Sequence, residues 1–140
     1  MSFLSKLIKQ CRRPSGWLGE LTAIKMNSGH AKMTAWALGH LPIGKEDFIL
    51  DVGCGGGRTV NRLAKLATDG KVIGLDFSES SVKISTQTNR DFIKAGRVEI
   101  RQGSVSAIPF CDDSFDLVTA VETYYFWPDL NADLREIRRV

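Results

Sequence analysis

The sequence has few cysteines and no long apolar run. Cys11, Cys54 and Cys111 are widely spaced and form no Cys-x-x-Cys pair, so neither a disulfide framework nor a zinc site is expected. No apolar stretch approaches the ~20 residues of a transmembrane helix, and Leu7-Ile8 is too short for the core of a secretory signal. We therefore expect a cytoplasmic protein with no bound metal and no membrane span.

Net charge is also low. The formal charge is +3, and the lysines and arginines are scattered along the chain, so nucleic acid is not expected as a partner. The 140 residues, 43% of them hydrophobic and 25% charged, are enough to bury one core. Internal repeats and low-complexity linkers are absent. This composition is typical of a single enzyme-type domain.

The strongest positive signal is a glycine-rich turn between an expected strand and an expected helix. Apolar residues 48–50 lead into Asp51-Val52-Gly53-Cys54-Gly55-Gly56-Gly57, and residues 59–67 have helical composition. Glycines allow a tight turn and let a ligand approach peptide N–H groups, while the helix start adds partial positive charge. A nucleotide-like ligand is therefore expected at this turn.

Three nucleotide-binding patterns compete for the turn. A P-loop fails, because Gly57-Arg58-Thr59 has no lysine and Val52 stands where its first glycine belongs. The dinucleotide fingerprint is met at Gly53 and Gly55, but its third glycine would fall on Arg58. An NAD(P)-binding domain of an oxidoreductase therefore remains as the weaker alternative.

The third pattern is Asp-x-Gly-x-Gly-x-Gly, which has an acid two residues before the first glycine. In this form the turn resembles the first motif of the class I S-adenosylmethionine (SAM) dependent methyltransferases. A second expected strand, Lys71 to Asp76, ends in an acid 19 residues after Gly57, as one strand–helix–strand unit requires. A carboxylate at that place can accept hydrogen bonds from both ribose hydroxyls of an adenosine ligand.

The resemblance continues to the end of the chain. Expected strands at residues 97–101 and 114–120 flank Gly103 to Phe110. Together they resemble the Gly-Asp-Ala, Leu-Pro-Phe and Ser-Phe-Asp pattern of small-molecule methyltransferases, including those of quinone biosynthesis. The resemblance covers Phe48 to Val140. It implies an α/β, Rossmann-like fold whose parallel sheet has the strand order 3-2-1-4.

The resemblance also implies the cofactor, SAM, with S-adenosylhomocysteine (SAH) as product, and a small-molecule methyl acceptor. The residues expected to bind the cofactor are Asp51, Gly53, Cys54, Gly55, Asp76, Phe77, Ser104, Val105 and Val121. Cys54 is interpreted as a small loop residue. Phe77 is placed against the adenine face or in the core. Ser104 stands where the family usually has Asp, and its hydroxyl is a weaker hydrogen-bond acceptor than a carboxylate.

Residues 121–128 hold the densest aromatic cluster, directly after the fourth expected strand. Ligands of open α/β sheets bind beyond the carboxyl ends of the strands, so we expect this cluster beside the methyl donor. The residues assigned to the acceptor side or the methionyl end are Glu122, Tyr124, Tyr125 and Trp127, together with His30. Phe126 is assigned to the core. No catalytic residue is assigned, because methyl transfer needs a base only if the acceptor must first lose a proton.

Residues 1–44 are expected to form an N-terminal helical region, followed by a partial Rossmann-like domain at 45–140. Phe3 to Cys11 has the pattern of a basic amphipathic helix. Such a helix can pack on its own domain or a partner, cap the active site, lie on an anionic membrane or serve as a transit peptide. A second helix is expected from Ser28 to Leu41, before Pro42. A further helix is expected from Asp129 to Val140, with Leu130, Leu134 and Ile137 on one side.

The family sheet has further strands after the fourth, and they are absent from this sequence. The fourth strand is then expected to have an unpaired edge, which favours a homodimer. The resulting hypothesis is a truncated SAM-dependent methyltransferase whose activity in this form is open. A non-catalytic SAM-binding or dimerisation fragment is the second alternative.

Overall fold

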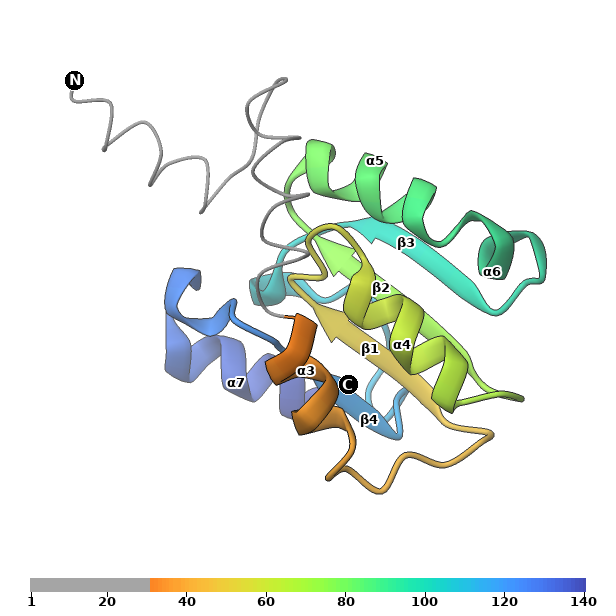
Figure 1. The fold of residues 1–140 in the computed structure, drawn as a ribbon. Coiled ribbons are helices and arrows are strands. Elements are labelled where there is room, and N and C mark those ends of the chain that lie inside the picture. The colour runs from red at the N-terminus through yellow and green to blue at the C-terminus, as the bar shows by residue number, and fades with distance from the viewer. Residues whose placement is uncertain (1–30) are drawn as a thin grey trace.

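The computed structural model describes residues 31–140. Its core is a four-stranded parallel sheet with the order β3-β2-β1-β4 (Figure 1). Phe3 to Cys11 and His30, which the sequence analysis singled out, lie outside the described residues. In chain order the elements are α3 (Ala31–Leu38), β1 (Phe48–Val52), α4 (Arg58–Leu66), β2 (Lys71–Asp76), α5 (Glu79–Thr88), α6 (Arg90–Lys94), β3 (Val98–Gln102), η1 (Val105–Ala107), β4 (Leu117–Thr119), η2 (Tyr124–Phe126) and α7 (Leu130–Arg139).

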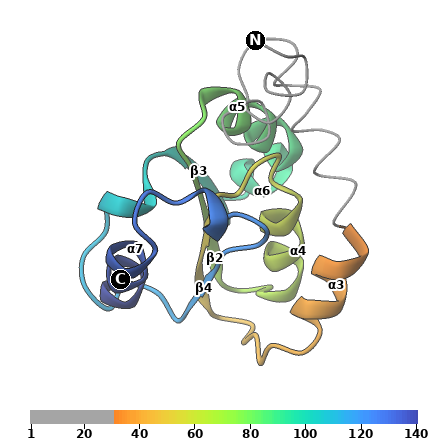
Figure 2. The ribbon, with the colours of Figure 1, turned by 90° about the vertical axis from the view of Figure 1, so that its left-hand side faces the viewer.

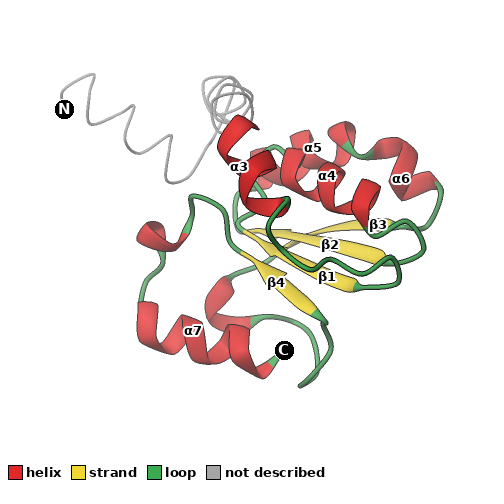
Figure 3. Cartoon of the chain, turned by 60° about the horizontal axis from the view of Figure 1, so that its bottom comes forward, coloured by secondary structure: helices red, strands yellow, loops and turns green. Residues whose placement is uncertain are grey.

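Helices cover both faces of the sheet. Figures 2 and 3 show α3, α4, α5 and α6 on one side and α7 on the other. This is the three-layer arrangement expected when parallel strands alternate with helices. The predicted α/β fold and strand order are confirmed. In the part of the chain that is described, no helix has the length and apolar character to cross a bilayer.

The side chains of the inner strands alternate between two apolar layers. Ile49 of β1 and Val72 of β2 pack with α4, whereas Leu50 and Ile73 pack with η1 and the end of α7. The strands have the period of two that this alternation requires. All four side chains are almost completely buried, so β1 and β2 form the rigid centre from which the loops at their carboxyl ends extend.

The fourth strand is shorter than predicted. β4 covers Leu117–Thr119 rather than residues 114–120. The backbone N–H of Phe115 donates to the carbonyl of Val140 at 2.9 Å. Phe115 is therefore bonded to the residue after α7 rather than to β1. The first of these residues to bond to β1 is Asp116, whose N–H donates to the Phe48 carbonyl at 2.9 Å.

Helix α7 begins as predicted but presents a different face to the core. Asp129 caps it by accepting the Ala132 N–H. Of the three apolar residues expected on one face, Leu130 and Leu134 are exposed, and only Ile137 packs against the core. The side chain buried instead belongs to Asp133, whose carboxylate accepts the hydroxyl of Ser106 at 2.7 Å and the N–H of Asp129 at 3.2 Å. A polar contact with η1 therefore helps to orient this helix.

One arginine ties α7 to the segment after η1. The guanidinium of Arg139 donates to the carbonyls of Ile108 at 3.0 Å and Phe110 at 2.8 Å. It also pairs with Glu136, and that carboxylate accepts the Ile108 N–H. This network fixes the loop that runs from the end of β3 back into the sheet.

The steric role of Gly57 leads to the first prediction. A Cβ at Gly57 would lie 2.3 Å from the Ser85 hydroxyl oxygen and 2.6 Å from Asn89 Nδ2, whereas a Cβ at Gly96 would meet nothing within 4 Å. Both glycines have a positive φ, at 81° and 73°. Gly57→Ala and Gly96→Ala therefore share a backbone strain of about 1–2 kcal/mol. Overpacking adds about 1–3 kcal/mol to Gly57→Ala alone.

Urea unfolding of the two variants measures this difference directly. Equal losses of stability would show that the contact of Gly57 with α5 carries no steric constraint.

Candidate functional site

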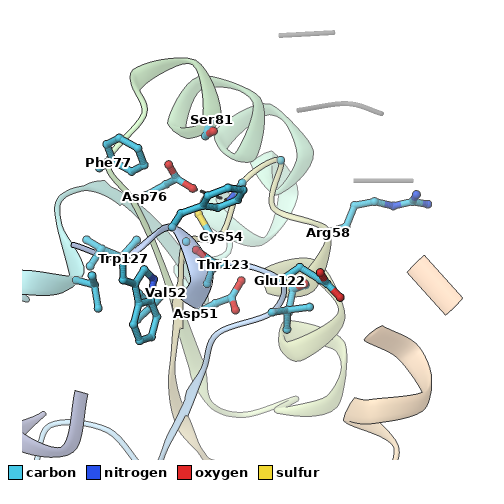
Figure 4. A pocket seen from close by; sticks show the side chains of 18 of the residues that line it. Asp51, Val52, Cys54, Arg58, Asp76, Phe77, Ser81, Glu122, Thr123 and Trp127 are labelled. Carbon is cyan, nitrogen blue, oxygen red and sulfur yellow. Dashed lines mark hydrogen bonds between the residues drawn. The ribbon is translucent and has the colours of Figure 1, made fainter. Parts of the chain in front are cut away.

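A pocket of about 300 Å³ opens at the carboxyl ends of β1, β2 and β4. Figure 4 shows residues that line it, which come from these strand ends, from the loops after them and from the starts of α4 and α5. Among its lining residues are all those that the resemblance assigns to the cofactor, namely Asp51, Gly53, Cys54, Gly55, Asp76, Phe77, Ser104, Val105 and Val121. The sheet therefore brings together residues that lie up to 70 positions apart in the sequence.

Gly53 and Gly55 of the turn both have a positive φ, but they differ in the space available for a side chain. Gly53 has φ 69°, and a Cβ there would lie 2.1 Å from the hydroxyl oxygen of Thr123. Gly55 has φ 52°, and a Cβ there would meet no atom within 4 Å. Gly55 also lines the pocket. The absence of its side chain therefore keeps a space free that a ligand can use.

Asp76 connects the glycine turn to the end of β2. Its Oδ2 accepts the Gly55 N–H at 2.8 Å, and its Oδ1 accepts the Ser78 N–H at 2.9 Å. Burial raises the pKa of the Asp76 carboxyl, and the two backbone donors offset part of that rise. Each carboxylate oxygen has a second lone pair, so Asp76 can hold the turn and still accept hydrogen bonds from a ligand.

Asp51 is the second buried carboxyl in the pocket. Its Oδ1 accepts the hydroxyl of Thr119 at 2.7 Å, and only 2% of the residue is exposed. The pKa of Asp51 is raised to about 7, because burial raises it by more than the Thr119 hydrogen bond lowers it and the charge of Asp76 adds to the rise. Its protonation state therefore changes near neutral pH.

A buried polar stripe on α5 contacts the glycine turn at Gly57. Ser81, Ser85 and Asn89 follow one another at four-residue spacing and are at most 2% exposed. Asn89 Nδ2 donates to the carbonyls of Gly57 at 3.0 Å and Ser85 at 2.9 Å. The sequence analysis missed this stripe. The sequence pattern that could have indicated it is a row of small polar residues on the helix face that packs against the sheet, where apolar residues are expected.

Cys54 belongs to this supporting layer. Its thiol lies 3.7 Å from the Ser85 hydroxyl oxygen, and burial raises its pKa well above the usual range. A protonated thiol is a poor nucleophile. The geometry agrees with the interpretation of Cys54 as a small loop residue.

Phe77, Ser104 and Val105 form the side of the pocket next to β3. Phe77 is 40% exposed, so the alternative that it is a core residue is wrong. The Ser104 hydroxyl accepts the Ser106 N–H at 3.1 Å and caps η1. One of its lone pairs is therefore already engaged, which leaves the hydroxyl one acceptor position and its proton for a ligand.

The aromatic cluster after β4 is oriented differently from the prediction. Thr123, Phe126 and Trp127 line the pocket, whereas Tyr124 and Tyr125 do not and are about half exposed. Residues 124–126 form a 3-10 turn, in which side chains three positions apart share one face. Phe126 therefore points the same way as Thr123. The assignment of Phe126 to the core is wrong, and the two tyrosines lie outside the pocket.

Glu122 lines the pocket with an unusual backbone. Its φ is +55°, and it is one of two non-glycine residues with a positive φ in the described chain. Its Oε2 accepts the Tyr125 hydroxyl at 2.8 Å. Strained backbone of this kind gathers at functional sites. Tyr125 therefore contacts the pocket indirectly, through the carboxylate that it holds.

Further lining residues come from α3 and α4. They include Ala31, Thr34, Arg58 and Arg62, none of which the sequence analysis assigned to the site. Arg62 donates to the Ala31 carbonyl, which ties α4 to α3. The sequence signal for Arg58 was its place directly after the last glycine of the turn. In residues 31–140, no three His, Cys, Asp or Glu side chains are grouped so that they can hold a metal ion.

Comparison with known proteins identifies similar chains. The sequence profile of a family described as Methyltransferase domain matches residues 50–140. The demethylmenaquinone methyltransferase of Lactiplantibacillus plantarum is 42% identical over 93 residues, which make up 66% of this chain and 39% of that protein. The 27-O-demethylrifamycin SV methyltransferase of Amycolatopsis mediterranei is 32% identical over 109 residues, or 78% of this chain and 40% of that one.

A solved structure has the same fold. The crystal structure of a SAM-dependent methyltransferase from Aquifex aeolicus has a TM-score of 0.76 at 22% identity, over 86% of this chain and 66% of that one. The chain spans about two fifths of the length of the two curated relatives named above. These findings do not support the NAD(P)-binding alternative.

The raised pKa of Asp51 leads to the second prediction. A carboxyl that binds its proton more tightly in the folded chain adds stability below its unfolded pKa of 3.8, and that contribution is lost as pH rises through about 7. Asp51→Asn removes this titration. Between pH 5 and 8 the free energy of unfolding should fall by about 3 kcal/mol more in the wild type than in the variant.

Urea unfolding at several pH values measures the two curves. Parallel curves would contradict the assignment of a proton to Asp51 near neutral pH.

Proposed function

This chain belongs to the methyltransferase domain family, and from that premise we propose that it binds SAM and transfers the methyl group to a small-molecule acceptor. The observation that carries the proposal is the pocket at the strand ends, where the glycine turn and Asp76 meet. Bound SAM supplies a methyl group already activated on a sulfonium. The protein then has to align donor and acceptor and exclude water, which can supply ~7–11 kcal/mol.

The residues present fit this cofactor. The open space above Gly55 suits a ligand that lies along the turn. Asp76 has lone pairs for the ribose hydroxyls, and Phe77 offers an exposed ring to the adenine. Ser104 and the backbone of Val105 are assigned to the adenine edge. Asp51 and the backbone of Val121 lie toward the methionyl part.

The acceptor is assigned to the side of the pocket formed after β4. Phe126 and Trp127 give this side an apolar wall, and Glu122 provides a carboxylate that Tyr125 holds in place. A base is needed only for an acceptor that must lose a proton, and Glu122 is then the residue in position to take it. Demethylmenaquinone and 27-O-demethylrifamycin SV, the acceptors in the names of two relatives, are the first compounds to assay.

Other properties stay predictions from the sequence. They are a cytoplasmic location, the absence of nucleic acid as a partner, a homodimer, and the division into regions 1–44 and 45–140. His30 as a substrate residue is also a prediction. Light scattering tests the assembly state, and assays with the acceptors above test the activity of this chain.

The third prediction concerns the ribose contact. Asp76→Ala removes a charged acceptor, and each hydrogen bond to a charged group contributes about 1.5–3 kcal/mol. The Kd values of both SAM and SAH should therefore rise at least about tenfold in calorimetry, while NAD should not bind to the wild type. Asp69→Ala, which removes an exposed carboxylate just before β2, is the matched control and should bind like the wild type. Unchanged SAM affinity in Asp76→Ala would refute the ribose assignment.

The fourth prediction concerns the space above Gly55. Gly55→Val places a branched side chain in the pocket, so binding of SAM and SAH should be lost. Gly96→Val is the matched control, because Gly96 also has a positive φ and open space around its Cβ. Both variants carry a similar backbone strain. Comparable thermal unfolding with loss of binding only in Gly55→Val is expected, and normal binding in that variant would show that the turn is merely structural.

A further inference from the structure

The two buried carboxyls of the pocket are not equivalent. Asp76 accepts two backbone N–H donors, one on each oxygen. Asp51 accepts a single neutral hydroxyl, from Thr119, on one oxygen. Both are buried. A buried carboxylate needs compensating donors or an opposite charge, so Asp51 is the less compensated anion of the two.

No cation in the described chain compensates the negative charge of ionised Asp51. The charged neighbour that acts on Asp51 is Asp76, at the end of the adjacent strand β2, and it has the same sign. From α4, Arg62 gives a hydrogen bond to the Ala31 carbonyl, and the side chain of Arg58 extends away from Asp51 (Figure 4). The remaining titratable groups at the pocket are the Cys54 thiol, which stays neutral, and Glu122, an acid that lies beyond β4.

We propose that Asp51, positioned by Thr119, makes this pocket discriminate between the cationic methyl donor and its neutral-sulfur product, increasingly so as pH rises. The inference rests on the proposed function. SAM carries a positive sulfonium, whereas SAH has an uncharged thioether in its place. An ionised Asp51 attracts the sulfonium strongly, because charges interact more in a buried site than in water. Protonated Asp51 does not distinguish the two sulfur atoms by charge.

The protonation balance gives the proposal a direct signature. When a cation binds beside Asp51, the ionised form is favoured, and the proton leaves for the buffer. Burial holds the pKa of Asp51 near 7 before binding, so the exchange occurs in the neutral range. A neutral thioether does not drive this release. Loss of the methyl group therefore weakens the hold of the pocket on the product and favours its exchange for a new donor.

Calorimetry with SAM and with SAH tests the proposal on the full chain. Titrations at about pH 6 and pH 8, each in two buffers of different ionisation enthalpy, give both affinity and the number of protons released. The ratio of the SAH Kd to the SAM Kd should rise about tenfold over this range, which corresponds to one pKa unit of differential interaction. At the lower pH, SAM should release more protons than SAH.

Three variants separate Asp51 from other causes. In Asp51→Asn the change of the ratio with pH should shrink to what titration of the ligands' own amino groups produces. Asp116→Asn, which removes an exposed carboxylate at the opposite end of β4, is the control and should behave like the wild type. Thr119→Val removes the hydrogen bond that favours ionised Asp51, so the pH at which the ratio changes should move upward.

The outcomes distinguish this inference from the proposed function. If neither SAM nor SAH binds, the proposed function fails and the inference fails with it. If both bind but the ratio is constant with pH, or changes equally in Asp51→Asn, the inference alone is overturned. Should Asp51→Asn fail to fold, an unmoved profile in Thr119→Val overturns it.

Discussion

The parallel pairing of β1 with both β2 and β4 brings together the glycine turn and the two buried carboxyls on which the site is built. β1 aligns Val52 with Leu75 on one side and Asp51 with Thr119 on the other. The Leu75 carbonyl then accepts the N–H groups of Gly53 and Cys54, so the sheet ladder continues into the glycine turn. Because all strands run the same way, their carboxyl ends and the loops after them meet at one edge.

This edge concentrates features that lower stability. It buries two carboxyls, holds Gly53, Gly55 and Gly57 at positive φ, and strains Glu122. The apolar layers above and below β1 and β2 offset that cost, because Ile49, Val72 and their neighbours are almost fully buried. Marginal local stability beside a rigid core is typical of ligand sites. The fold therefore separates the residues that provide stability from those that face the ligand.

Local patterns made most of the fold predictable. The bounds of β2, Lys71 to Asp76, match the prediction because an apolar run ends in an acid there. The tyrosines were misplaced for a different reason. Nothing in residues 121–128 reveals a 3-10 turn, and an extended chain would have turned Tyr125 rather than Phe126 toward the pocket. The supporting stripe of α5 escaped notice because its contact with Gly57 spans 32 residues of sequence. Such contacts depend on packing, which sequence periodicity does not encode.

The α5 stripe also helps to hold the shape of the turn. Gly57 has no room for a side chain because Ser85 and Asn89 occupy that space, and Asn89 then bonds to the Gly57 carbonyl. Asp76 holds the turn from the other side through the Gly55 N–H. The segment between these two anchors lines the pocket at Gly55 and Gly56, and a Cβ at Gly55 would meet no atom within 4 Å. A turn fixed at both ends in this way loses little conformational entropy when a ligand binds, so more of the contact energy appears as affinity.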